Sequence, residues 1–267
     1  MALGTARGMT IASLLEPVTG KPGPARLAHA SEWMQGRTLY GGASALVAYT
    51  AAIRAFPDLP PLRSGQIAFV APVGAEVTPR AELIRQGRNV TQVRVELLVE
   101  GRIALTSLWL FGTEREPNAV HQAEPVAPHP TPVDKAEVMM EGKGPAFIQN
   151  NFEVRFGQAK DDDHGATVRR WARLTEDHEL GPVSKLVLMG DVMPPGAMRI
   201  MKRMGPISSI NWSFNVLDPE TRSEGGWYLA ENASQHADHG YSSERLRMWD
   251  SEGRQVLDGL QCVAVFG

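Results

Sequence analysis

Hydrophobic and polar residues follow two periods along the chain, and the elements they predict come in the same order in both halves. In the first half, residues 43–56 (ASALVAYTAAIRAF) are rich in Ala and Leu and contain no Gly or Pro. They are apolar on nearly every face, which predicts a buried helix. Around it, short apolar segments predict strands, and Glu100-Gly-Arg102 predicts a tight turn between the last two. The expected strands are Ala25–Ala30, Gln66–Val70, Glu76–Gln86, Val90–Val99 and Ile103–Phe111.

The second half repeats this order. Val183–Asp191 is predicted to be a helix, Pro194-Pro195 interrupts it, and Ala197–Met204 resumes helical composition. Neither half alternates strand and helix as a doubly wound parallel sheet does, so an antiparallel sheet with few helices is expected. The strands expected here are Phe152–Phe156, Thr167–Leu174, Ser208–Leu217, Trp227–Ser234, Tyr241–Trp249 and Arg254–Phe266.

The likeness of the halves extends to individual residues. The stretch VEGRIALTSLWLFG (99–112) resembles SEGRQVLDGLQCVAVFG (251–267), and Gly101 and Gly253 hold the same place 152 residues apart. Residues 113–145 contain closely spaced prolines, which disfavour both a helix and a central strand. We therefore predict an N-terminal repeat at residues 1–112, a Pro-rich linker at 113–145 and a C-terminal repeat at 146–267, descended from one duplicated unit.

Composition narrows the classes of function. The 267 residues are 43% hydrophobic and carry a net charge of −3, so no excess of basic residues points to nucleic acid or an anionic membrane. The single cysteine, Cys262, excludes a disulfide framework within the chain and a cysteine-based zinc site. Apolar runs are shorter than the roughly 20 residues of a membrane span, and the N-terminus lacks a signal-peptide core. A soluble, cytoplasmic protein without a metal is expected.

Two stretches carry a resemblance to a known family. The segment LYGGASALVAYTAAIRAF (39–56) and the ending GWYLAENASQHADHGYSSERLRMWDSEGRQVLDGLQCVAVFG (226–267) resemble the tandem hot-dog acyl-CoA thioesterases of the thioesterase II group. The resemblance implies an α+β double hot-dog, in which each sheet wraps one long helix and the two sheets join. It also implies hydrolysis of an acyl-CoA thioester to a free acid and CoA, without a metal or redox cofactor.

In such enzymes an acidic residue, a hydroxyl residue and a Gln hold the attacking water. The Gln falls on Gln261 of the last strand, where the first repeat has Trp109. The hydroxyl falls at Ala233-Ser234, of which Ser234 is the residue that can act; Ala233 is assigned to substrate binding beside it. An amide such as that of Gln261 can accept a hydrogen bond from the water and donate one to an oxygen.

The acidic position departs from the pattern of the family. It falls on Asn211, which can orient a water but cannot accept its proton, so general-base catalysis through it is lost. Asp191, at the end of the second predicted helix, is a replacement candidate, and so are His236 and Asp238. The departure also leaves open a protein that binds acyl-CoA or another lipid thioester without hydrolysing it.

The start of the first helix has a separate interpretation. In Tyr40-Gly41-Gly42, glycine allows close approach to a ligand, and free helix-start amides can stabilise the oxyanion of a thioester under attack. The alternative is that both glycines only let the helix pack tightly. Asp161-Asp-Asp-His164 is interpreted as a solvated loop, and a hot-dog dehydratase is disfavoured because no Asp and His fall at a fitting place. A homodimer through the outer sheet face is compatible with the pattern.

Overall fold

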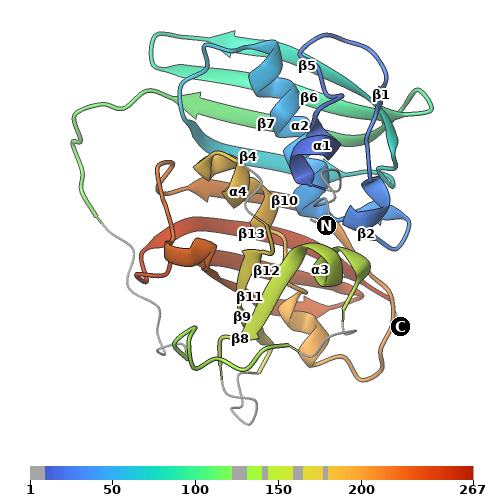
Figure 1. Ribbon diagram of the computed structural model, residues 1–267, viewed down its shortest axis with the longest axis vertical. Helices are drawn as coiled ribbons and strands as arrows, with labels where there is room; N and C mark the ends of the chain where they lie inside the picture. The colour runs from blue at the N-terminus through green and yellow to red at the C-terminus, as the bar shows by residue number, and fades with distance from the viewer. Residues whose placement is uncertain (1–9, 122–130, 140–143, 159–164, 177–179, 267) are drawn as a thin grey trace, which may run out of the picture.

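Eleven strands of the described residues form one antiparallel sheet that runs through both halves of the chain (Figure 1). The computed structural model describes residues 10–121, 131–139, 144–158, 165–176 and 180–266. The strand order is β1-β5-β6-β7-β4-β10-β13-β12-β11-β9-β8, and β2 pairs with β3 separately. The bounds are β1 Ala25–Arg26, β2 Met34–Gln35, β3 Thr38–Leu39, β4 Leu62–Phe69, β5 Glu76–Gln86, β6 Val90–Val99, β7 Arg102–Gly112, β8 Phe152–Phe156, β9 Thr167–Leu174, β10 Ile207–Val216, β11 Tyr228–Asp238, β12 Tyr241–Trp249 and β13 Gln255–Val265.

The two halves join at the middle of this sheet, where β4 of the first half pairs with β10 of the second. Gln66 lies opposite Ser213 in this antiparallel pair. The strands on each side follow the same connectivity, and the ends of β5 and β11 are separated by the same 152 residues as the two Glu-Gly-Arg turns. The central pair therefore acts as a seam between two similar units.

The helix of the first half forms as its composition predicts. Helix α2 (Gly41–Ala55) is buried along most of its length and packs against β5, β6 and β7 (Figure 1). Its apolar side chains are buried against the sheet on one side and against α4 and the N-terminal segment on the other. That segment carries the short helix α1 (Ile11–Leu15), and Arg54 near the end of α2 donates to the backbone oxygens of Leu15 and Val18.

The second half has no helix of comparable length among the described residues. Helix α4 spans only Pro182–Met189, and the helical segment expected at Ala197–Met204 is reduced to a 3-10 helix, η2, at Gly196–Arg199. The prolines at 194 and 195 cannot supply backbone donors, so the chain cannot continue as one helix. The short helix α3 (Ala146–Asn151) leads directly into β8.

Part of the predicted linker is packed against the second half. The main-chain N–H of Met139 donates to the oxygen of Val154, and the Trp171 indole donates to the oxygen of Thr131 at 2.7 Å. Residues 131–139 thus cover a small apolar cluster on the sheet face opposite the main core, which contains Ala136, Trp171, Trp227, Leu229 and Trp249. The middle of the linker and the Asp161–His164 segment lie outside the described residues.

Candidate active site

The start of α2 and the end of α4 meet in the interior. The hydroxyl of Tyr40, the residue just before α2, donates to the main-chain oxygen of Leu188 at 2.8 Å, and its ring stacks on Phe147. A Cβ on Gly42 would lie 2.0 Å from that same Leu188 oxygen. Tyr40 and Gly42 therefore hold the two helices together, which is the packing role that the sequence left open for the glycines.

Gly41 faces a different neighbour. A Cβ at this position would lie 2.0 Å from Oδ2 of Asp191, so only glycine lets the first residue of α2 approach the carboxylate this closely. Asp191 follows α4, whose last helical residue is Met189. The contact places the free amide end of one helix against an acid that comes directly after the other.

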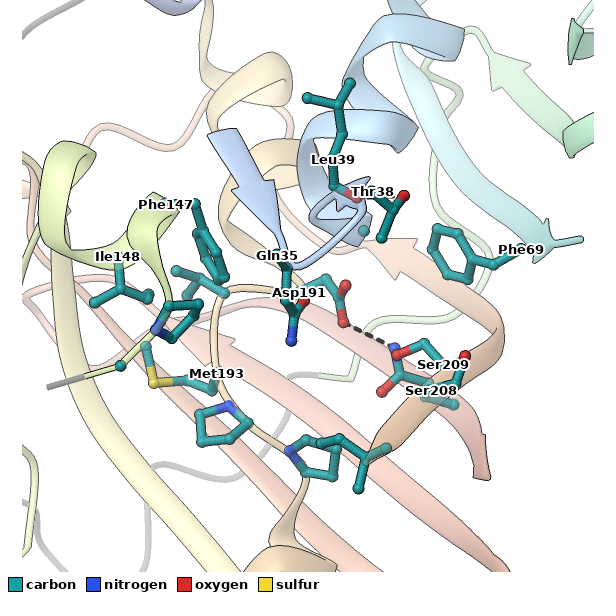
Figure 2. A pocket seen from close by; sticks show the side chains of 18 of the residues that line it. Gln35, Thr38, Leu39, Phe69, Phe147, Ile148, Asp191, Met193, Ser208 and Ser209 are labelled. Carbon is teal, nitrogen blue, oxygen red and sulfur yellow. Dashed lines mark hydrogen bonds between the residues drawn. The ribbon is translucent and has the colours of Figure 1, made fainter. Parts of the chain in front are cut away.

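The carboxylate of Asp191 is bonded to the Gln on the last strand of the second repeat. Nε2 of Gln261 donates to Oδ1 of Asp191 at 2.8 Å, across 70 residues of sequence (Figure 2). Gln261 is buried, with 3% of its surface exposed. Because the amide nitrogen is used for this bond, the Gln261 amide oxygen is left to accept from another group.

Burial raises the pKa of Asp191 from 3.8 to about 7, although the bond from Gln261 acts in the opposite direction. Desolvation disfavours the charged form of a carboxylic acid, which explains the sign. The neighbouring Tyr40 is also affected: burial, and then the charge of Asp191, raise the pKa of its phenol well above 10. At neutral pH, Asp191 is therefore divided between a proton-accepting and a proton-donating form.

Asp191 and Gln261 lie in the wall of a cavity of about 660 Å³, a size typical of small-molecule sites (Figure 2). Gly41 also lines it, as do two hydroxyl residues at the start of β10, Ser208 and Ser209. Most of the remaining wall is apolar. Its members include Leu39, Phe69, Met139, Phe147, Ile148, Val154, Val192, Met193, Pro194, Pro195, Met198 and Ile207.

Five residues that the sequence assigned to the site lie outside this cavity lining: Tyr40 and Gly42, which join the two helices, and Asn211, Ala233 and Ser234. Asn211 is exposed on β10, and its Oδ1 accepts from the main-chain N–H of Cys262 at 3.1 Å. Ala233 and Ser234 lie on β11, where the Ser234 hydroxyl is 2.8 Å from that of Ser242. The structure thus brings together Asp191, Gln261 and Gly41, and it does not bring Asn211, Ala233 or Ser234 to them.

Ser208 and Ser209 were missed by the sequence interpretation. The resemblance placed the acid on the strand after the second helix and the hydroxyl on the strand after that. In the structure both groups lie one element earlier in the chain. The acid is Asp191, after the helix, and the hydroxyls are those of Ser208 and Ser209, at the start of the next strand. A β-bulge between Ser209 and Asn211 changes which side chains face the cavity, and no sequence pattern marks it.

Ser234 instead belongs to a polar network behind the cavity wall. The Ser242 hydroxyl donates to Glu244 at 2.6 Å, and the fully buried Glu244 accepts the main-chain N–H groups of Gly196 and Ala197. Asn232 donates to the oxygen of Met193 at 2.9 Å. These bonds fix residues 193–198, several of which line the cavity.

The described residues contain no group of three His, Cys, Asp or Glu side chains arranged to hold a metal ion. No helix within the described ranges combines the length and apolar character needed to cross a membrane.

Solved structures define the class of the fold. A conserved protein with a hot-dog fold from Alicyclobacillus acidocaldarius superposes with a TM-score of 0.80 at 20% identity, covering 95% of this chain and 98% of its own. A TesB protein of Mycobacterium avium subspecies paratuberculosis gives 0.74 at 17% identity, covering 96% and 98%. An acyl-CoA thioesterase II, TesB2, of Mycobacterium marinum gives 0.69 at 16% identity, covering 86% and 91%. The expected α+β hot-dog fold is confirmed.

Family models place the chain more narrowly. Residues 29–112 match the N-terminal domain of acyl-CoA thioesterases, and residues 123–265 match the C-terminal domain. No curated protein sequence matches the chain. The protein belongs to the acyl-CoA thioesterase family, as the resemblance of its two stretches predicted.

Proposed function

We propose that the protein hydrolyses acyl-CoA thioesters, with Asp191 as the general base. The observation that carries this proposal is a carboxylate with a pKa of about 7, held by Gln261 at 2.8 Å in the wall of a largely apolar cavity. A base whose pKa lies near the operating pH is both available and strong enough to take a proton from water. The apolar wall suits an acyl chain.

The reaction follows from this geometry. Asp191 takes one proton of a water, whose oxygen bonds to the thioester carbonyl carbon, and the electron pair of the C=O bond moves onto the carbonyl oxygen. When the tetrahedral intermediate collapses, the carbon–sulfur bond breaks with its electrons on sulfur. The proton held by Asp191 passes to the sulfur, giving CoA and the free acid. The Gln261 amide oxygen and the hydroxyls of Ser208 and Ser209 are the groups that can orient the water.

The start of α2 supplies donors for the oxyanion. The first amide that bonds back within the helix is that of Ser44, which donates to the Tyr40 oxygen at 3.0 Å. The amide of Gly41, at the cavity, precedes it and is one of the helix-start donors without an acceptor inside the helix. Such preorganised donors, with the positive end of the helix dipole, favour the charge that develops on the carbonyl oxygen.

The test is thiol release from acyl-CoAs of several chain lengths. The wild-type protein is expected to release CoA. Asp191→Asn removes the general base and is expected to lower kcat/KM by about 100-fold or more. Gln261→Ala removes the hydrogen-bond partner of that base and is expected to lower kcat/KM by about 10-fold. Asp258→Asn is the matched control, because Asp258 lies on the same strand as Gln261 and pairs with Arg245 outside the cavity. Asn211→Ala is expected to retain activity. This result would distinguish a site built on Asp191 from the site predicted from the sequence, in which Asn211 takes the acidic position.

The non-catalytic alternative rested on the missing acid at Asn211. Asp191 provides an acid in the cavity, so that argument no longer favours a binding protein. The same experiment decides between them: acyl-CoA binding in a calorimeter without thiol release at any chain length contradicts hydrolysis.

A further inference from the structure

Two cations, Arg37 and Arg170, line the otherwise largely apolar cavity; Arg37 is exposed, and Arg170 is the one that is partly buried. Arg170, on β9, lines the cavity and is half-buried. Its guanidinium lies over the Phe156 ring, 4.4 Å from the centroid, and its Nη1 donates to the main-chain oxygen of Arg169 at 2.8 Å. Among the residues that the structure describes, no carboxylate pairs with it, so most of its N–H donors have no protein acceptor.

The neighbouring arginines of the same strand are paired. Arg169 bonds Glu231 through Nε at 2.9 Å, and Arg173 bonds Glu153 through Nη2 at 2.5 Å. Successive residues of a strand face opposite sides of the sheet, so Arg169 and Arg173 point away from the cavity face that Arg170 occupies. Within the described ranges, the fold supplies carboxylates to Arg169 and Arg173 on the outer face and none to Arg170.

A second guanidinium reinforces the positive charge at this end of the cavity. Arg199 of η2, whose Nε donates to the Gly165 oxygen at 3.0 Å, lies close enough to act on Arg170. Burial, and then the charge of Arg199, lower the pKa of Arg170 to about 10, so it remains a cation at neutral pH. Keeping a half-buried cation beside a like charge is unfavourable unless an anion offsets it.

This positive end is separate from the reactive carboxylate. Asp191 bonds Gln261 on β13, and two strands, β12 and β11, lie between β13 and β9, the strand of Arg170. At about 4.8 Å per strand, β13 and β9 are roughly 14 Å apart across the sheet. The acyl group and the thiol-bearing arm leave a bound thioester carbonyl in different directions. Either of them can extend into the part of the cavity that Arg170 lines.

We propose that Arg170, supported by Arg199, binds an anionic oxygen group of the substrate at the end of the cavity remote from Asp191. The group is a carboxylate at the far end of the acyl chain or a phosphate of the CoA arm. A guanidinium offers paired N–H donors that match both. This inference rests on the proposed hydrolysis of acyl-CoA and assigns to it a residue that selects the substrate.

The experiment compares substrates that differ in one anion. Hexanoyl-CoA and adipyl-CoA have the same number of acyl carbons, and only adipyl-CoA has a terminal carboxylate. Hexanoyl and adipyl thioesters of N-acetylcysteamine lack the phosphates. The variants are Arg170→Gln, Arg170→Lys and, as a control on the outer face of the same strand, Arg173→Gln. Thermal melting confirms that each variant is folded.

We expect Arg170→Gln to lower kcat/KM at least tenfold for the thioesters that carry the bound anion. A loss for both adipyl thioesters, with hexanoyl-CoA unaffected, identifies the acyl carboxylate. A loss for both CoA thioesters and for neither N-acetylcysteamine thioester identifies a phosphate. Arg170→Lys is expected to retain part of the preference because the charge remains, and Arg173→Gln to match the wild type.

Equal effects of Arg170→Gln on all four thioesters, or effects below twofold, overturn the proposal even if the protein hydrolyses acyl-CoA. If the wild type releases no thiol, the proposed hydrolysis fails, and the anion site is measured by calorimetry with CoA and adipyl-CoA. Weaker binding of either to Arg170→Gln than to the wild type then supports the site, and unchanged affinity for both contradicts it.

Discussion

The pKa of Asp191 depends on where its side chain is held. Its pKa of about 7 follows from burial, and Gln261 moderates the rise by donating to the ionised form. The carboxylate is the form that accepts a proton, so kcat/KM is expected to rise with pH, with an apparent pKa near 7, and to level off above it. Gln261→Ala removes a bond that favours the carboxylate, so the rising limb is expected to move to higher pH.

Profiles of kcat/KM between pH 5 and 9 for both proteins measure this effect. A wild-type rate that does not change across this range, or a limb that moves to lower pH in the variant, contradicts the assignment of the base. Titration of the Tyr40 phenol does not contribute to the profile in this pH range, because its pKa is raised well above 10.

The same residue links stability to pH. The folded-state pKa of Asp191 is about 7 and the ordinary value is 3.8, so the unfolded chain binds fewer protons between these values and the carboxyl destabilises the fold as pH rises through this window. Asp191→Asn removes the free-energy cost of ionising this buried carboxyl group. Urea denaturation is expected to show the variant more stable than the wild type at pH 8, by about 1 kcal/mol or more, and the difference to shrink at pH 4. A variant less stable at pH 8 would contradict this account.

How far single residues can be predicted depends on what marks them in the sequence. Gln261 was found because the family resemblance implies a Gln on the last strand, where the first repeat has Trp109, and Asp191 because it ends a predicted helix. Ser208 and Ser209 have no such mark. Their place in the cavity depends on a bulge and on the packing of β10 beside the end of α4, which arise only in three dimensions.

At the scale of elements, two adjacent glycines at the start of α2 have different functions. An added Cβ at Gly41 meets the Asp191 carboxylate, which can turn away, so Gly41→Ala is expected to lower kcat/KM more than tenfold with a small change in melting temperature. An added Cβ at Gly42 meets the main-chain oxygen of Leu188, which cannot move without separating the helices. Gly42→Ala is therefore expected to cost about 1–3 kcal/mol of stability.

Thermal melting and thiol release, measured on both variants, separate the two roles. If Gly41→Ala is fully active, or if Gly42→Ala melts like the wild type, the corresponding close approach does not have the consequence argued here. Ala43, the next residue of α2, shows that the helix accepts an alanine side chain at a neighbouring position.

The 3-10 helix η2 is held by a buried acid, and this too can be tested. Glu244 accepts two main-chain N–H groups, from Gly196 and Ala197, and the Ser242 hydroxyl. Glu244→Gln replaces one acceptor oxygen by an NH2 group that faces donors, so it is expected to cost about 1–3 kcal/mol. Because Met193, Pro194, Pro195 and Met198 line the cavity, KM is expected to rise more than kcat falls.

Denaturation and steady-state kinetics of Glu244→Gln provide the measurement, with Ser234→Ala as a milder companion because Ser234 acts only through Ser242. An unchanged KM in a clearly destabilised Glu244→Gln would show that the network supports the fold without shaping the cavity. Equal losses in the two variants would contradict the central place given to Glu244.

Elements differ in how well the pattern of hydrophobic residues predicts them. The bounds of β5, β6, β8, β9 and β12 agree with the expected strands, because alternation and the turn residues at their ends define them locally. The helices of the second half do not, since helical composition at Ala197–Met204 yields only η2. The first residues of η2 bond to Glu244, and the space around them does not admit a longer helix. A Cβ on Gly196 would already lie 2.0 Å from the oxygen of Ala166.

At the scale of the molecule, the two similar repeats differ at the residue that bonds Asp191 in the second repeat. The place of Gln261 in the first repeat is taken by Trp109, which is fully buried and packs edge-on against Tyr49 and Phe214. Even an alanine Cβ at Gly65 would lie 2.8 Å from the Trp109 ring and 2.7 Å from that of Phe214, so this side of the seam is filled. Close-packed aromatic rings leave neither space nor polar partners for a water.

The duplication therefore predicts one ligand per chain. Calorimetric titration of an acyl-CoA into Asp191→Asn, which we expect to bind the thioester without turnover, is expected to give a stoichiometry of one. Two equivalent sites would contradict the argument that Trp109 closes the first repeat. Trp109→Ala leaves a cavity that is apolar, so it is expected to lower stability by about 3–5 kcal/mol without adding a second catalytic site. In the proposed site, the second repeat thus supplies Asp191 and Gln261, and the first repeat supplies the helix start at Gly41.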